Sequence, residues 1–127
     1  MSVPVVALVG GDLMARARLQ DAADRHGVEL LSVAPGTLEQ ALRDTELEIL
    51  ILDLDAGGIP LLEELDHVRE AGPAPARVVG FFSHVDHALG EAATSRGCDA
   101  MPRGRFWRTL PELLGPPGRQ STEPSED

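Results

Sequence analysis

Short apolar runs rich in valine, isoleucine and leucine are the feature that most constrains this chain. Residues 3–9 and 48–53 are two such runs, and they end at a glycine pair and at an aspartate. Continuous apolar runs of this length are typical of strands that are covered on both faces, as in parallel sheets. The chain is therefore expected to build a parallel sheet with helices on both sides.

The rest of the sequence alternates strand and helix patterns. Further strands are predicted over residues 28–33, 78–82 and 99–102. Helices are predicted over residues 12–26, 37–43, 60–71, 83–96 and 105–114. Because consecutive strand–helix–strand units give parallel strands, the predicted class is α/β, a doubly wound five-stranded parallel sheet of the flavodoxin-like type.

Polar and turn residues predict where the helices begin and end. Asp12 is expected to cap the first helix through its carboxylate. Residues 37–40 and 83–86 have the spacing of capping boxes. Residues 56–58 are predicted to form a loop before a helix that begins at a proline, and Pro111 is expected to interrupt the last helix.

The length of 127 residues suits one domain, predicted over residues 1–114 with a linker at 72–76. Residues 115–127 are rich in proline, glycine and acidic residues and are predicted to be a disordered acidic tail. The single cysteine, Cys98, excludes an internal disulfide and fits a reducing compartment. The apolar runs are too short to span a membrane. The prediction is a cytoplasmic protein that does not contact membranes.

The net charge is −10, and all eleven basic residues are arginine. Such an excess of carboxylates repels phosphate backbones and predicts that nucleic acid is not a partner. One cluster combines arginines and aromatic rings, side chains that are favoured at interfaces. It consists of Arg103, Arg105, Phe106, Trp107 and Arg108. These residues are candidate contacts for a protein partner or for self-association through residues 84–114; the alternative is a solvated helix face with apolar anchors.

The order of elements resembles the receiver domain of bacterial response regulators over residues 3–114. Three segments carry the resemblance: LILDLD at 50–55, VVGFFS at 78–83 and RGCDAMP at 96–102. The resemblance implies that Asp53 stands at the phosphoacceptor position, with Asp55 as the alternative. It also implies that Ser83 and Met101 stand at two switch positions.

Receivers also use an acidic pair after the first strand, which holds Mg²⁺, and a lysine that neutralises phosphoryl oxygens. By the resemblance, Gly10 and Gly11 stand at the acidic pair, and Gly104 stands at the lysine position between Arg103 and Arg105. Losing these groups removes most of the charge stabilisation that phosphoryl transfer needs. The prediction is a pseudo-receiver: a phosphorylation-independent protein-interaction module in signalling or regulation, without enzymatic activity, metal or cofactor.

Other interpretations stay open. Asp53 can be the phosphoacceptor of a genuine receiver that uses Mg²⁺, or a carboxylate that simply ends a strand. Gly10 and Gly11 can bring backbone amides to a small ligand in a flavodoxin-like protein. Residues 83–87 (SHVDH) contain metal-ligating side chains, although a zinc site needs partners elsewhere.

Overall fold

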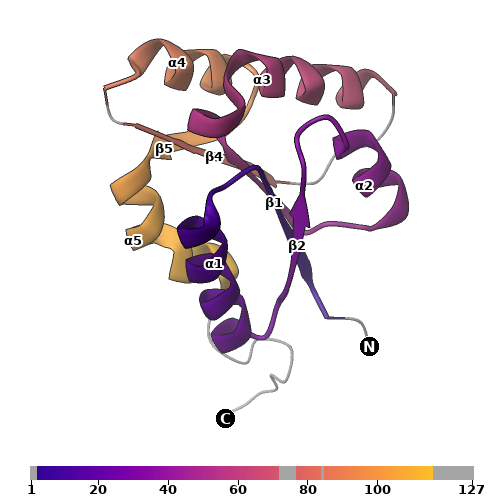
Figure 1. Cartoon of the computed structure of the whole chain (residues 1–127), viewed down its shortest axis with the longest axis vertical. Helices are drawn as coiled ribbons and strands as arrows, with labels where there is room; N and C mark the ends of the chain where they lie inside the picture. The colour runs from indigo at the N-terminus through magenta and orange to yellow at the C-terminus, as the bar shows by residue number, and fades with distance from the viewer. Residues whose placement is uncertain (1–2, 72–76, 84, 116–127) are drawn as a thin grey trace.

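The computed structural model describes residues 3–71, 77–83 and 85–115. The predicted linker at 72–76, His84 and residues 116–127 of the predicted tail lie outside the described residues. Five parallel strands form one sheet in the order β2-β1-β3-β4-β5 (Figure 1). The strands are β1 (Val5–Val9), β2 (Glu29–Val33), β3 (Ile49–Asp53), β4 (Arg77–Phe82) and β5 (Asp99–Pro102). The predicted fold class is confirmed.

Helices cover both faces of the sheet (Figure 1). One layer consists of α1 (Leu13–His26) and α5 (Arg103–Leu114). The other layer consists of α2 (Leu38–Asp44), α3 (Leu54–Ala71) and α4 (His87–Ser95). Every residue of the central strand β3 is buried, as its continuous apolar sequence predicts. No helix in the described part of the chain is long and apolar enough to cross a membrane.

Two neighbouring residues of β4 show how the core divides into two. Side chains alternate along a strand, so Phe81 packs toward α1 and α5 while Phe82 packs toward α3 and α4. Phe81 stacks on Phe106 with ring centroids 4.6 Å apart, and Trp107 lies 5.0 Å from Phe106. The α1/α5 side of the core is therefore aromatic, whereas the other side is mostly aliphatic.

The two helix layers also differ in charge. α1 and α5 together carry six arginines and three carboxylates, namely Arg16, Arg18, Arg25, Arg103, Arg105 and Arg108 against Asp21, Asp24 and Glu112. α2, α3 and α4 together carry two arginines and eight carboxylates, namely Arg43 and Arg69 against Glu39, Asp44, Asp55, Glu63, Glu64, Asp66, Glu70 and Glu91. The layer of three helices is thus strongly acidic, and the layer of two is basic.

The first and fourth helices are capped by aspartates. The Oδ1 atom of Asp12 accepts from the backbone N of Ala15 at 2.8 Å, which confirms the predicted cap of α1. α4 begins after Asp86, whose Oδ1 accepts from Leu89 N at 3.2 Å. The expected capping box at 83–86 is therefore corrected to a cap by Asp86 alone.

The second helix is capped from a distance. Thr37 makes no side-chain cap, so the capping box predicted at 37–40 is wrong. The carboxylate of Glu64, on α3, instead accepts from Gly36 N at 2.8 Å and from Leu38 N at 2.9 Å. One side chain of α3 thus satisfies two free amide groups at the start of α2.

The third and fifth helices also differ from their predicted extents. α3 begins at Leu54, directly after β3, and not at Pro60; a sharp bend at Gly58 (φ 59°, ψ −154°) separates its first turn from the rest. α5 begins at Arg103 and continues through Pro111. The buried stripe of α5 explains this continuity, because its members lie on both sides of the proline: Phe106, Leu110, Leu113 and Leu114.

Candidate functional site

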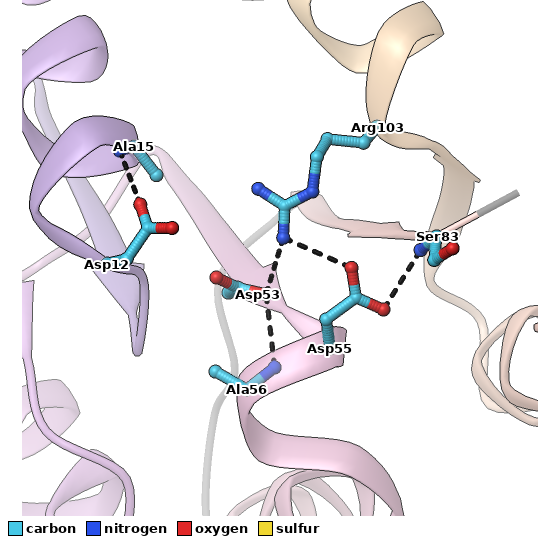
Figure 2. A network of polar contacts seen from close by, with 7 residues as sticks. All are labelled: Asp12, Ala15, Asp53, Asp55, Ala56, Ser83 and Arg103. Carbon is cyan, nitrogen blue, oxygen red and sulfur yellow. Dashed lines mark hydrogen bonds and ion pairs between the residues drawn. The ribbon is translucent and has the colours of Figure 1, made fainter.

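The carboxyl ends of the parallel strands meet at one edge of the sheet, where sites of doubly wound folds lie. Asp53 is the last residue of β3, and Asp55 lies in the first turn of α3. Ser83 follows β4, and Arg103 is the first residue of α5. Figure 2 shows these four residues converging from three separate parts of the chain.

Arg103 bridges the two aspartates. Its Nη2 atom lies 3.1 Å from Oδ2 of Asp55 and 3.4 Å from Oδ1 of Asp53 (Figure 2). Its guanidinium carbon lies 4.7 Å from the ring centroid of Phe81. The aspartates of this edge therefore already share a cation that belongs to the chain itself.

The carboxyl group of Asp53 is almost completely enclosed, with 4% of its side chain exposed. Its Oδ1 accepts a hydrogen bond from the backbone N of Ala56 at 3.2 Å. Burial raises the pKa of Asp53 above its ordinary value, and it outweighs the lowering effects of the Ala56 N–H and of Arg103. The surroundings of Asp53 thus disfavour its charged form relative to water.

Asp55 connects three elements. Its Oδ1 accepts from the backbone N of Ser83 at 2.9 Å, and its Oδ2 binds Arg103. The side chain of Asp55 therefore ties the end of β4 and the start of α5 to the first turn of α3. Ser83 takes part through its backbone amide.

The end of β1 contributes backbone and no acidic side chain. Gly10 and Gly11 have φ angles of 81° and 87°. A Cβ atom on Gly11 would lie 2.8 Å from Cδ2 of Leu8, closer than real side chains approach. Asp12 is the next acidic residue, and its carboxylate accepts a hydrogen bond from the backbone N of Ala15. It lies away from Asp53 (Figure 2).

The resemblance to receivers implies Mg²⁺, so the donor atoms at this edge can be tested against that ion. Magnesium is held by carboxylate oxygens in octahedral geometry, with several waters retained. Here both available carboxylates, Asp53 and Asp55, bind Arg103, and Gly10 and Gly11 offer no ligand. Over residues 3–71, 77–83 and 85–115, no three His, Cys, Asp or Glu side chains group so as to hold a metal ion. The donor set does not fit magnesium.

The two aromatic residues nominated as partner contacts have different environments. Phe106 is completely buried and stacks on Phe81, so it is a core residue and is corrected as a partner contact. Trp107 is partly buried, and the guanidinium carbon of Arg18 lies 4.1 Å from its ring centroid. Both rings nevertheless pack toward Phe81, with ring centroids 4.6 Å away for Phe106 and 6.0 Å away for Trp107.

The remaining nominated residues lie at the start of α5 or in the core. Arg105 and Arg108 are exposed, whereas Arg103 turns toward the aspartates. Gly104 is exposed in the first turn of α5, and Met101 is buried. Arg103 stands beside the lysine position, and its bridge to the two aspartates was not predicted. A usable signal was that Arg103 is the first basic residue after β5, at an edge with two aspartates.

A groove of about 380 Å³ lies between α4 and β5, within the predicted partner region. Residues of α4 supply most of its lining, and Phe82 and Ala100 of the sheet supply the rest. Gly90 lies directly against Phe82, since a Cβ there would be 2.5 Å from the ring. The small residues of α4 thus leave open surface beside the sheet.

No protein-family model matches this sequence, and no curated protein is significantly similar to it. Solved structures are similar. One is the co-crystal structure of the Saccharomyces cerevisiae histidine phosphotransfer signaling protein Ypd1 and the receiver domain of its downstream response regulator Ssk1 (TM-score 0.70, 17% identity, covering 88% of this chain and 86% of that one).

Two further solved structures are similar to this chain. The receiver domain of the TMAO respiratory system response regulator TorR has a TM-score of 0.70 and 14% identity, covering 87% of this chain and 96% of that one. A response regulator from Thermotoga maritima has a TM-score of 0.70 and 16% identity, covering 89% and 98%. The chain therefore has the fold of response-regulator receiver domains.

Proposed function

We propose that this chain is a phosphorylation-independent protein-interaction module in signalling or regulation, a pseudo-receiver. One observation carries the proposal: Arg103, a residue of the chain itself, forms ion pairs with both Asp53 and Asp55. A carboxylate that is already paired with an arginine of the same chain binds an added cation more weakly.

The chemistry of phosphoryl transfer supports the same proposal. Such transfer depends on precise positioning and on cations that stabilise the charge on the phosphoryl oxygens. The Asp53 carboxyl is enclosed and accepts from Ala56 N and Arg103. The end of β1 supplies Gly10 and Gly11 in place of ligands. Phosphorylation of Asp53 is therefore expected to be too slow to carry a signal.

The proposed partner is a protein or a second copy of this chain, bound through residues 84–114. A receiver domain of similar fold occurs in a co-crystal structure with a phosphotransfer protein. The exposed Arg105 and Arg108 and the half-buried Trp107 remain candidate contacts. The proposal includes a cytoplasmic location and no binding to nucleic acid or membranes.

A genuine receiver phosphorylated at Asp53 with Mg²⁺ is the second candidate. Its supporting observation is that Asp53 ends the central strand β3 at the carboxyl edge, next to Ser83 and Arg103. This candidate requires Mg²⁺-dependent phosphorylation that the Asp53→Asn substitution abolishes.

Amide NMR of the full chain separates the two candidates. Mg²⁺ is added first and beryllofluoride, a phosphoryl mimic, second. The proposal expects no saturating shifts at Asp53, Ser83 and Gly104. Coordinated shifts that saturate at these residues overturn it in favour of the genuine receiver. Arg103→Ala is expected to gain a weak Mg²⁺ response because it frees both carboxylates, whereas Arg108→Ala, on the same helix, serves as the unchanged control.

A further inference from the structure

We propose that the groove between α3 and α4 is the docking site for a basic amphipathic helix of a partner protein. The inference rests on the proposed function and deepens it, because it gives the interaction module a surface and its partner a chemistry. α3 and α4 lie side by side over the same face of the sheet (Figure 1).

The groove has an apolar floor and an acidic rim. Its volume is about 350 Å³. The large apolar side chains that line it are Leu54, Ile59 and Leu89. Asp86 supplies the carboxylate at its rim, since Asp55, which also lines it, already pairs with Arg103. This combination suits an apolar side chain that enters the groove and a cationic side chain that stays at its rim.

One exposed apolar side chain lines this groove, and a second stands next to one of its lining residues in the sequence. In the described part of the chain, the large hydrophobic residues that are exposed are Val3, Leu13, Met14, Ile59 and Val85. Ile59 is 43% exposed and lines the groove, and Val85, 71% exposed, directly precedes Asp86 of its rim. Exposed apolar groups beside a concave surface are typical of protein-binding sites.

Charge selects the kind of helix that fits. The groove lies in the acidic layer, where α2, α3 and α4 carry eight carboxylates and two arginines. A helix with a basic face is attracted to this layer, and an acidic helix is repelled. Laying the apolar face of a helix into a groove is a common mode of recognition. The occupant is therefore a helix that is apolar on one face and basic on its edges.

The neighbouring groove between α4 and β5 fits such a helix less well. Its one large apolar lining residue, Phe82, is only 8% exposed, and Glu91 is its one carboxylate, so it lacks an exposed large apolar side chain such as Ile59. The α3/α4 groove also reaches Asp55, which holds Ser83 and Arg103. A helix docked there contacts the same side chain that organises the carboxyl edge.

The probe is a synthetic amphipathic helix of leucine and lysine, titrated into the full chain by amide NMR. Shifts are expected at Gly58, Ile59, Ala88 and Leu89, and a peptide with glutamate in place of lysine is expected not to bind. Ile59→Glu and Val85→Glu should each raise Kd at least about tenfold by placing a charge on the apolar contact. The matched control is Leu13→Glu, at an exposed apolar residue on α1, which should leave Kd unchanged.

The asparagine variant of the rim tests the charge argument. Asp86→Asn keeps an oxygen that caps α4 and removes the charge, so it should raise Kd about two- to threefold and weaken the dependence on salt. Peptide shifts confined to α1 and α5 or to the α4–β5 groove overturn the proposal. So does equal weakening by Leu13→Glu, or the absence of binding.

Repeating the titration with Mg²⁺ and beryllofluoride separates this inference from the proposed function. Binding at the α3/α4 groove that requires beryllofluoride keeps the docking site and overturns phosphorylation independence. A protein that responds neither to beryllofluoride nor to the peptide keeps the proposed function and overturns the docking site.

Discussion

The two faces of the sheet are covered by different kinds of side chain. On the α1/α5 side, Phe81, Phe106 and Trp107 form a contiguous aromatic cluster. On the α3/α4 side, Phe82 lies below a short helix built largely of alanine and glycine, with a groove on either flank. The comparison indicates that the aromatic side fixes α5 in place, while the other side keeps surface open.

Fixing α5 matters for the candidate site. Arg103 is the first residue of α5, and Phe106, three residues later, is anchored in the aromatic cluster. The guanidinium of Arg103 lies over Phe81 on its way to Asp53 and Asp55. Packing on the α1/α5 side thus orients the Arg103 guanidinium toward the two aspartates at the carboxyl edge.

The largest expected effect comes from truncating the two adjacent rings of β4. Phe81→Ala should lower the free energy of unfolding by about 4 kcal/mol, because Phe81 is completely buried against Phe106. Phe82→Ala should lower it by about 3 kcal/mol, because Phe82 is buried but faces a groove. Urea unfolding measures both. Equal losses would show that the two sides are packed alike and would break the comparison.

Removing the bridging arginine comes next. Arg103→Ala should lower the free energy of unfolding by about 1 to 2 kcal/mol at neutral pH, since two carboxylates lose their counter-ion and the arginine is partly solvated. The loss should shrink as pH falls and the carboxyls become protonated. Arg108→Ala, exposed on the same helix, should change stability by less than about 0.5 kcal/mol. A loss that does not vary with pH contradicts an electrostatic origin.

The caps of α1 and α4, one helix in each layer, give a smaller contrast. Asp12→Ala should lower the free energy of unfolding by about 1 kcal/mol, because its Oδ1 accepts from Ala15 N at 2.8 Å. Asp86→Ala should cost about half of that, because its bond to Leu89 N is longer, at 3.2 Å. Thermal unfolding of both variants tests the order, and a larger loss for Asp86→Ala reverses it.

The smallest effect is expected from Asp53→Asn, and its sign follows from the pKa. Burial raises the folded-state pKa of Asp53 above 3.8, so the folded protein binds a proton more tightly than the unfolded chain does. Wild-type stability therefore falls as pH rises from the unfolded-state pKa through the folded-state pKa. Asp53→Asn removes that loss while keeping an acceptor for Ala56 N.

Urea unfolding across pH measures this difference. The asparagine variant should be slightly more stable than the wild type at pH 7, and the two should converge below the unfolded-state pKa. A variant that is less stable at pH 7 would mean that Arg103 stabilises the charged carboxyl more than burial penalises it.

Local patterns in the sequence were enough to predict the strands and the topology. The apolar runs place each strand within two residues of its observed ends, because buried parallel strands need continuous apolar sequence. The cap by Asp12 was predictable because its partner lies three residues away. The parallel order of the strands brings Asp53, Asp55 and Ser83 to one edge, because the carboxyl ends of parallel strands meet there.

The features that could not be predicted from the sequence depend on contacts between residues far apart in the chain. Glu64 caps α2 from α3, across 26 residues of sequence, so no local spacing indicates it. The bridge from Arg103 to Asp53 spans 50 residues and depends on how α5 packs. The early start of α3 depends on burial of Leu54 against the sheet, where a turn-based rule expected a loop.

The glycine pair after β1 limits how this protein can be re-engineered. Installing an acidic pair by Gly10→Asp and Gly11→Asp would place two L side chains at φ angles of 81° and 87°, which they rarely adopt. At Gly11 the new Cβ would also collide with Leu8. Substituting Gly10 and Gly11 alone therefore cannot install an acidic pair here, because the backbone of the turn between β1 and α1 has to change together with its side chains.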